Sequence, residues 1–159
     1  MRTFNFPKPL APGTVRLIHF ANKEAVFREH PTILPEDVIT GSCREPDFVH
    51  GEAERVLEFT GVNRQLLYLD LIREIPRQPP MVFYVETTVE LPFSLSLTVA
   101  FDRAVAVANE NNFDTISTGV LLIGILQVES VVQEVFEKHS VTADAAKQAL
   151  AAVRGIKVT

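Results

Sequence analysis

The segment TGVLLIGIL, from Thr118 to Leu126, is apolar around the whole circumference of a helix. A helix without a polar face is stable only when its neighbours cover it on all sides. We therefore expect this segment to form the central helix of the core. Thr118 is expected to cap its amino terminus, because a hydroxyl can accept a hydrogen bond from a free amide of the first turn.

The same pattern occurs earlier in the chain. The stretch ILPEDVITG, from Ile33 to Gly41, aligns with the stretch from Ile116 to Gly124 in a constant register, which we call the first register. The pairs that share this register are Ala21 and Ala104, Ala25 and Ala108, Ile33 and Ile116, Val38 and Leu121, Ile39 and Leu122, and Gly41 and Gly124. Further along, a second register pairs Val56 with Val135, Leu57 with Phe136, and Val62 with Val141, so the first copy has four additional residues in the intervening loop. A repeat of this length indicates two similar helical units that share one core.

Each copy is predicted to contain four helices. In the first copy, apolar residues recur at steps of three and four from Thr14 to about Glu29, the spacing of one buried helical face. Pro35, followed by two carboxylates, indicates the start of a second helix. Residues 41–51 are expected to form a loop, Gly61 to end the third helix, and residues 66–75 to form the fourth. The second copy is expected to have helices from Ser94 through Ala108 and over residues 118–126, 131–139 and 142–153.

The sequence thus predicts an all-α fold of about eight helices, arranged as two pseudo-symmetric repeats in a single domain over residues 1–159. Repeat one covers about residues 11–75, repeat two about 94–154, and residues 76–93 link them. The linker contains MVFYVETTV, which is typical of a strand. Because one strand cannot satisfy its own backbone, we expect it to lie extended along the helices or to pair with a short segment such as the extended arm of residues 1–12. Pairing with another chain is the less favoured outcome.

Composition and charge narrow the class of protein. Apolar residues make up 47% of the chain and charged residues 22%, as in an ordinary soluble globular protein. A net charge of −5 argues against a nucleic-acid or anionic-membrane partner. The longest apolar run, Val120 to Leu126, is too short to span a membrane. The proline-broken start is unlike a secretory signal, and a single cysteine, Cys43, fits a reducing compartment such as the cytoplasm.

The duplicated pattern resembles the double Clp repeat, which forms the amino-terminal domain of Clp-type unfoldase ATPases such as ClpA, ClpB and ClpC. The second copy carries the family's features in order, at Phe93 and Ser94, Ala104 and Ala108, Ile116, Thr118, and LLIGIL from Leu121 to Leu126. The first copy is more diverged, although VLEFTGVN over residues 56–63 is a close match. The resemblance extends over about residues 11–154 and implies two four-helix repeats.

The chain departs from the family pattern at several polar positions. Gly119 and Val120 replace the family's Glu-His pair, Asp37 replaces a histidine, and Ala11 stands where the second copy has Ser94. No glycine begins a GxxxxGKS or GxxxxGKT phosphate loop. We therefore expect a free-standing amino-terminal-type domain without an ATPase module.

The resemblance implies a non-enzymatic protein-binding module that acts as an adaptor, accessory subunit or substrate-capture domain of a Clp unfoldase or protease system. Its partners would be Clp ATPase or protease subunits, adaptors or substrate polypeptides. Similar free-standing proteins include the plastid ClpT accessory proteins, so the plastid stroma is the alternative to the cytoplasm for a protein from a plant or an alga. No cofactor, catalytic residue or metal site is expected, and the four histidines lack metal-ligand spacing.

Two groups of residues are candidates for protein binding. In the resembled family, the position of Ser94 borders a groove between the repeats that receives substrate or adaptor segments. Phe93 and Ser94 are therefore candidates, although the simplest role of Ser94 is that of a helix cap. The second group is Met81, Val82, Phe83 and Tyr84, which could recruit a partner strand through main-chain hydrogen bonds. The alternative for this group is a linker packed on its own core.

Two further hypotheses belong to other functional classes. Cys43 and His50 could form a thiol nucleophile and its base in a scaffold recruited for small-molecule or thiol-dependent work. Spacing alone does not fix their geometry, and a loop cysteine without such a role is the simpler interpretation. The repeats could also serve as a dimerising regulatory domain.

Overall fold

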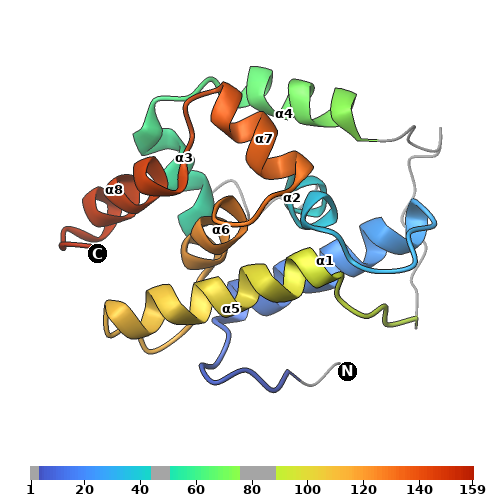
Figure 1. Ribbon diagram of the computed structural model, residues 1–159, viewed down its shortest axis with the longest axis horizontal. Helices are drawn as coiled ribbons and strands as arrows, with labels where there is room; N and C mark the ends of the chain where they lie inside the picture. The colour runs from blue at the N-terminus through green and yellow to red at the C-terminus, as the bar shows by residue number, and fades with distance from the viewer. Residues whose placement is uncertain (1–3, 44–50, 76–88) are drawn as a thin grey trace.

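The computed structural model describes residues 4–43, 51–75 and 89–159. These residues form eight helices and no named strand (Figure 1). The helices are α1 (Pro12–Phe27), α2 (Pro35–Cys43), α3 (Glu52–Thr60), α4 (Arg64–Glu74), α5 (Leu95–Glu110), α6 (Thr118–Leu126), α7 (Val131–Lys138) and α8 (Ala143–Arg154). The predicted all-α class, with two four-helix repeats, is therefore confirmed. The strand predicted over residues 81–89 lies almost wholly outside the described residues.

Side-chain caps fix the amino termini of five helices. The side-chain oxygens of Asn63, Ser94, Ser117, Ser130 and Thr142 each accept a hydrogen bond from the backbone amide three residues later. Each bond satisfies an amide that has no partner inside its helix. These residues therefore set where the chain enters each helix.

One predicted cap is wrong by one residue. Ser117, rather than Thr118, caps α6, and its hydroxyl accepts from the amide of Val120 at 3.2 Å. The hydroxyl of Thr118 instead accepts from the backbone amide of Ala53 at 3.1 Å. Thr118 therefore links α6 to the start of α3, a long-range contact that local sequence pattern does not reveal.

The loop predicted from Gly41 begins later than expected, because α2 continues to Cys43. Gly41 lies inside the helix at a close contact with α1. A Cβ atom at this position would lie 3.0 Å from the backbone nitrogen of Ala21. The glycine therefore serves helix packing and does not end α2.

The backbone repeats itself in the two registers seen in the sequence. The first register, which pairs Ile33 with Ile116, maps both bounds of α1 and α2 onto those of α5 and α6. The second register, which pairs Val56 with Val135, maps the first residues of α3 and α4 onto those of α7 and α8. Unusual backbone angles repeat as well. Glu29 and Asn112, each two residues past the end of a long helix, have φ of 59° and 57°, and Gly61 and Ser140 have φ of 77° and 63°. The two copies therefore share local conformation even where their residues differ.

The two copies are joined by a reciprocal exchange of short extended segments. Leu10 forms a parallel bridge with Ile116, and Phe93 forms one with Ile33. In the first register Leu10 corresponds to Phe93 and Ile33 to Ile116. The two bridges are therefore equivalent: in each, a residue just before the long helix of one copy pairs with the isoleucine of the other copy. The hydrogen bonds follow the same rule, because Ala11 donates to Ile116 at 3.0 Å while Ser94 donates to Ile33 at 2.9 Å. Such reciprocity is the mark of a two-fold relation, as in an isologous dimer interface.

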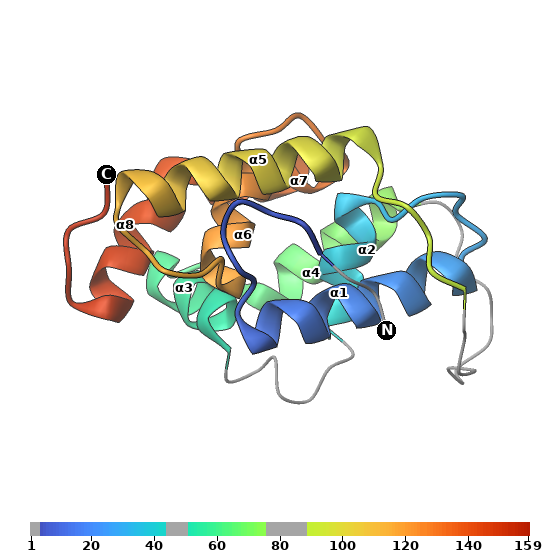
Figure 2. The ribbon, with the colours of Figure 1, turned by 90° about the horizontal axis from the view of Figure 1, so that it is seen from below.

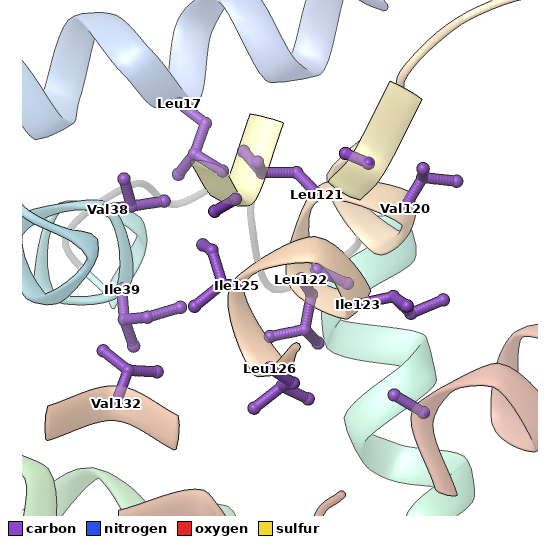
Figure 3. Packing of buried hydrophobic residues seen from close by; sticks show 14 of the residues in the cluster. Leu17, Val38, Ile39, Val120, Leu121, Leu122, Ile123, Ile125, Leu126 and Val132 are labelled. Carbon is purple, nitrogen blue, oxygen red and sulfur yellow. The ribbon is translucent and has the colours of Figure 1, made fainter. Parts of the chain in front are cut away.

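Helix packing obeys the same two-fold relation. α3 packs on α8, and its counterpart α7 packs on α4. α6 contacts α1, α3, α5, α7 and α8, and every residue of α6 is buried. Figure 3 shows Leu17 of α1 and Ile39 of α2 directed at this helix. The predicted central position of α6 is thus confirmed by its surroundings.

α6 approaches α5 so closely that no side chain fits between them at Gly124. A Cβ atom there would lie 2.3 Å from the carbonyl oxygen of Ala100 and 3.0 Å from the nitrogen of Ala104. Backbone atoms cannot move aside as a flexible side chain can. The contact therefore requires glycine on α6 and small residues on α5.

We expect Gly124→Ala to lower the free energy of unfolding by about 1–3 kcal/mol, the range of an overpacked core. Gly41→Ala, at the equivalent but looser contact, should cost less. Chemical denaturation followed by circular dichroism measures both. The matched control is Gly13→Ala, where the nearest atom to a new Cβ is 3.8 Å away. That variant should be neutral or stabilised by about 0.5–1 kcal/mol, and an equal loss in all three variants would contradict the packing argument.

Candidate functional site

The described end of the inter-repeat segment, residues 89–93, lies along α1. The side-chain amide of Asn22 donates to the carbonyl of Val89 at 2.7 Å, and its oxygen accepts from the amide of Leu91 at 2.8 Å. Ile33 then continues this pairing, because its amide donates to Pro92 at 2.8 Å. Only Val89 of the predicted strand is among the described residues, so the expectation that the strand lies extended along the helices stays a prediction.

Four phenylalanines stack where this segment meets the amino-terminal arm, residues 4–11. We call Phe4, Phe6, Phe93 and Phe101 the aromatic column. Phe101 of α5 is fully buried and forms its floor. The rings of Phe6 and Phe93 lie over Phe101 with centroids 4.6 and 5.2 Å away, and Phe4 stacks on Phe6 and Phe93 at 6.0 and 6.2 Å. Figure 2 shows the arm crossing the space between α1 and α5.

An open groove of about 500 Å³ lies beside the column. Its wall on one side comes from the arm and on the other from residues 90–93, and its lining residues are Phe4, Asn5, Phe6, Glu90, Leu91, Pro92 and Phe93. A groove of this size between two extended backbone segments has the shape and apolar surface to receive a peptide side chain or a short extended segment.

The two candidate residues at the start of α5 have different roles. Phe93 is partly exposed and belongs to both the column and the groove. Ser94 is buried, and its hydroxyl accepts from the amide of Leu97 at 3.1 Å and contacts the hydroxyl of Ser96 at 3.1 Å. The hydroxyl of Ser94 therefore has the capping role that the sequence also indicated, directly beside Phe93.

The other candidates have separate outcomes. Met81, Val82, Phe83 and Tyr84 lie outside the described residues, as does His50. Cys43 is the last residue of α2, and its side chain is also outside the description. Phe4, Phe6 and Phe101 were not predicted as site residues. The alternation Phe-Asn-Phe at residues 4–6 is the signal that could have indicated the first two.

A second pocket lies inside the core and is too small for an organic ligand. It is lined by residues of α1, α2, α3, α4, α6 and α7, including Leu17, Val38 and Phe136, and holds about 10 Å³. This is at most the volume of one water centre. It gives no support to a small-molecule function.

Repeat one carries a buried polar cluster that repeat two lacks. Asp37 is fully buried, its carboxylate lies 2.9 Å from Nδ1 of His30, and it accepts from the amide of Leu34 at 2.9 Å. Burial raises the pKa of Asp37, against the opposing effect of these hydrogen bonds, and burial likewise raises the pKa of Glu36. In repeat two, the equivalents of His30 and Asp37 are Phe113 and Val120.

Glu52, the first residue of α3, joins the two copies. Its carboxylate accepts from Nε and Nη2 of Arg154 at 2.8 and 3.0 Å and from the hydroxyl of Ser117. The guanidinium of Arg154 also lies over the ring of Phe113, 4.2 Å from its centroid. Each polar group has a partner within the chain, so the network is structural.

Within residues 4–43, 51–75 and 89–159, no group of three His, Cys, Asp or Glu side chains is placed to hold a metal ion. No single helix in these ranges is long and apolar enough to span a membrane. α6 and α7 reach that length and hydropathy only when taken together, and the pair is bent by 91°.

An apolar face lies on the outer side of α4. Leu66, Leu69 and Ile72 are between 44% and 53% exposed. Their equivalents on α8 are Ala145, Gln148 and Ala151, so this face is particular to repeat one. If the repeats serve as a dimerising domain, this face is the surface through which two copies would pack.

Duplicated four-helix units with a groove at their junction define the class of this protein as a double helical repeat. The family described as the Clp repeat (R) N-terminal domain matches residues 13–139. The chain belongs to this family. No curated protein matches the sequence.

Solved structures share the fold at low sequence identity. The Hsp104 N-terminal domain from Candida albicans has a TM-score of 0.73 and 12% identity, with 95% of each chain covered. The N-domain of ClpV from Vibrio cholerae has a TM-score of 0.60 and 14% identity, with 98% of this chain and 96% of that chain covered. The N-terminal domain of the chaperone ClpD from Arabidopsis thaliana has a TM-score of 0.59 and 15% identity, with 98% and 99% covered. At such identities the likeness shows the fold alone.

The raised pKa of Asp37 predicts a pH dependence of stability. Between the ordinary aspartate value of 3.8 and the higher folded value, the folded state binds more protons than the unfolded state. The contribution of Asp37 to the free energy of unfolding therefore falls as pH rises through this window and is constant above it. We expect the unfolding free energy of the wild type, minus that of Asp37→Asn, to decrease as pH rises through the window, so that the variant becomes relatively more stable. Urea denaturation at a series of pH values measures it.

The control lies within the same series, because above the raised pKa of Asp37 the difference between the wild type and Asp37→Asn should no longer change with pH. The opposite result is a difference, wild type minus Asp37→Asn, that rises with pH. It would show that the hydrogen bonds from His30 and Leu34 outweigh burial, and would contradict the prediction.

Proposed function

We propose that this protein is a non-enzymatic protein-binding module of a Clp unfoldase or protease system, in which the groove beside Phe93 takes an extended polypeptide segment. Its role is that of an adaptor, an accessory subunit or a substrate-capture domain. The proposed unit is a single double-repeat domain over residues 1–159, with repeats at about 11–75 and 94–154.

The observation that carries this proposal is the aromatic column and its groove at the junction of the two repeats. Phe93 is held rigidly, because the amide of Ser94 and the carbonyl of Pro92 both bond to Ile33. A rigid, partly exposed aromatic side chain at the edge of a groove loses little conformational entropy when it contacts a ligand. Such residues are the usual anchors of protein interfaces.

Family membership supports the choice of partners. The relatives include a caseinolytic protease-associated chaperone, ClpD, and the ATPase ClpV, whose described setting is a secretion sheath and an accessory protein. Clp ATPase or protease subunits, and the polypeptides that they handle, are therefore the proposed partners. The cytoplasm is the proposed setting, since a chain with one cysteine suits a reducing compartment.

The proposal of a non-enzymatic role has two supports. No phosphate-loop motif occurs in the 159 residues, and the enclosed pocket is too small for a substrate. The groove beside the column is walled mainly by aromatic and aliphatic side chains, which can bind a polypeptide but supply no nucleophile.

We expect Phe93→Ala to weaken binding of a polypeptide partner by about tenfold or more, as for the loss of an aromatic anchor. Fluorescence anisotropy measures this with purified Clp ATPase, purified Clp protease subunits and a permanently unfolded client such as reduced, carboxymethylated lactalbumin. The matched control is Leu95→Ala, because Leu95 is 81% exposed, lies two residues away and is outside the groove. Equal binding by both variants and the wild type, or no binding of any of the three probes, would refute the proposed function.

A further inference from the structure

We propose that the amino-terminal arm is a built-in competitor for the ring face of Phe93 and Phe101 beside the groove, and that the ligands of this face are extended polypeptides with aromatic side chains at alternate positions. This inference rests on the proposed function and names its ligand class and its regulation. Phe4 and Phe6 stack on Phe93 and Phe101. The aromatic side chains of a ligand take the same place when it binds.

The arm binds the column in the manner of an extended peptide. Phe4 and Phe6 are partly buried, whereas Asn5 and Pro7 are exposed. This alternation is that of a strand, in which every second side chain faces the same surface. The surface therefore accepts two aromatic rings spaced two residues apart, and the arm itself shows which ligand pattern fits.

The contact between arm and column rests on side chains. Among the described residues, no backbone hydrogen bond involves the stretch from Phe4 to Lys8. The first attachments are Nζ of Lys8, which donates to the carbonyl of Phe113 at 2.9 Å, and the carbonyl of Pro9, which accepts from Ile116 at 2.9 Å. Residues 4–7 can therefore leave the column while the attachments of residues 8–11 remain, at low cost in broken bonds.

The equivalent segment of the other copy is held more firmly. In the first register, residues 89–91 correspond to residues 6–8, and Asn22 anchors them with two hydrogen bonds. The equivalent of Asn22 on α5 is Val105, whose side chain has no polar atom. Of the two related extended segments, the amino-terminal arm is therefore the one that the structure leaves releasable.

Release of the arm would expose an apolar surface that needs a new cover. Phe101 is fully buried with the arm in place, and the ring of Phe6 is stacked on it at 4.6 Å. A ligand with equivalent rings restores this burial, whereas a polar segment does not. The arm thus discriminates against segments that lack aromatic residues, since they cannot compensate for its loss.

The expected size of the competition follows from tethering. A short flexible tether gives the arm an effective concentration on the order of millimolar at its own site. A free ligand must compete with this concentration. Its apparent affinity is therefore its intrinsic affinity multiplied by the fraction of molecules whose site is open. Weakening the arm should therefore tighten binding of a ligand from outside.

The test uses the full chain with the double substitution Phe4→Ala/Phe6→Ala. The probe is a fluorescein-labelled peptide of residues 4–10, FNFPKPL, and the readout is fluorescence anisotropy. We expect the double variant to bind this peptide at least about tenfold more tightly than the wild type. The control peptide ANAPKPL should bind neither protein. Adding Phe93→Ala to the double variant should abolish the gain.

Phe59→Ala is the matched control variant. Phe59 is 58% exposed near the end of α3, outside the column, so its removal should leave binding of FNFPKPL at the wild-type level. Equal affinity of the double variant and the wild type would overturn the inference. So would no binding of FNFPKPL to either protein. In both cases the proposed function still stands if Phe93→Ala weakens binding of Clp subunits or of the unfolded client. If Phe93→Ala binds them as well as the wild type does, the proposed function is refuted as well.

A second measurement needs no removal of a ring. Phe6 alone is replaced by 4-fluorophenylalanine, and the fluorine resonance is followed while unlabelled FNFPKPL is added. We expect the resonance to move to the position it has in the free labelled peptide as the site fills. A resonance that stays in place at saturation would show that the peptide binds elsewhere and would overturn the inference.

Discussion

The rest of the structure depends on the close approach of α6 to α5 at Gly124, where a Cβ atom would lie 2.3 Å from the carbonyl of Ala100. This contact lets α6 sink into the centre of the molecule, where every one of its residues is buried. The looser equivalent, Gly41 against Ala21, does the same for α2 and α1. With both pairs in place, the segments that precede α1 and α5 are brought beside Ile116 and Ile33, and the exchanged bridges can form.

Much of this arrangement could be predicted from the sequence, because a repeat constrains many positions at once. Eight helices, the two registers and the central place of α6 follow from apolar spacing and from paired small residues. The errors were local. Ser117 displaces Thr118 as the cap of α6 because Thr118 is used by Ala53, which is distant in the chain. The column was missed for the same kind of reason, since Phe6 and Phe101 meet only once the whole chain has folded.

The two copies have diverged in the interior as well as on the surface. Glu24, His30 and Asp37 in the first copy stand where the second has Val107, Phe113 and Val120. Glu24 and Asp37 are fully buried, and Glu24 pairs with Arg28 at 2.8 Å. Buried charges stabilise a fold less than apolar residues of the same size. The second copy, with α5 and α6, therefore supplies the more apolar half of the core, while the first copy carries buried polar groups.

This division explains why a nearly two-fold domain has a one-sided site. Phe101 corresponds to Ile18 and Phe93 to Leu10, so the two-fold partner of the column has aliphatic side chains in place of its two fixed rings. The column itself is assembled from three parts: the arm before the first copy, the segment between the copies, and α5 of the second copy. Neither copy alone could build it, and two identical copies would build it twice. A single aromatic site is thus a consequence of fusing two repeats and then letting their sequences diverge.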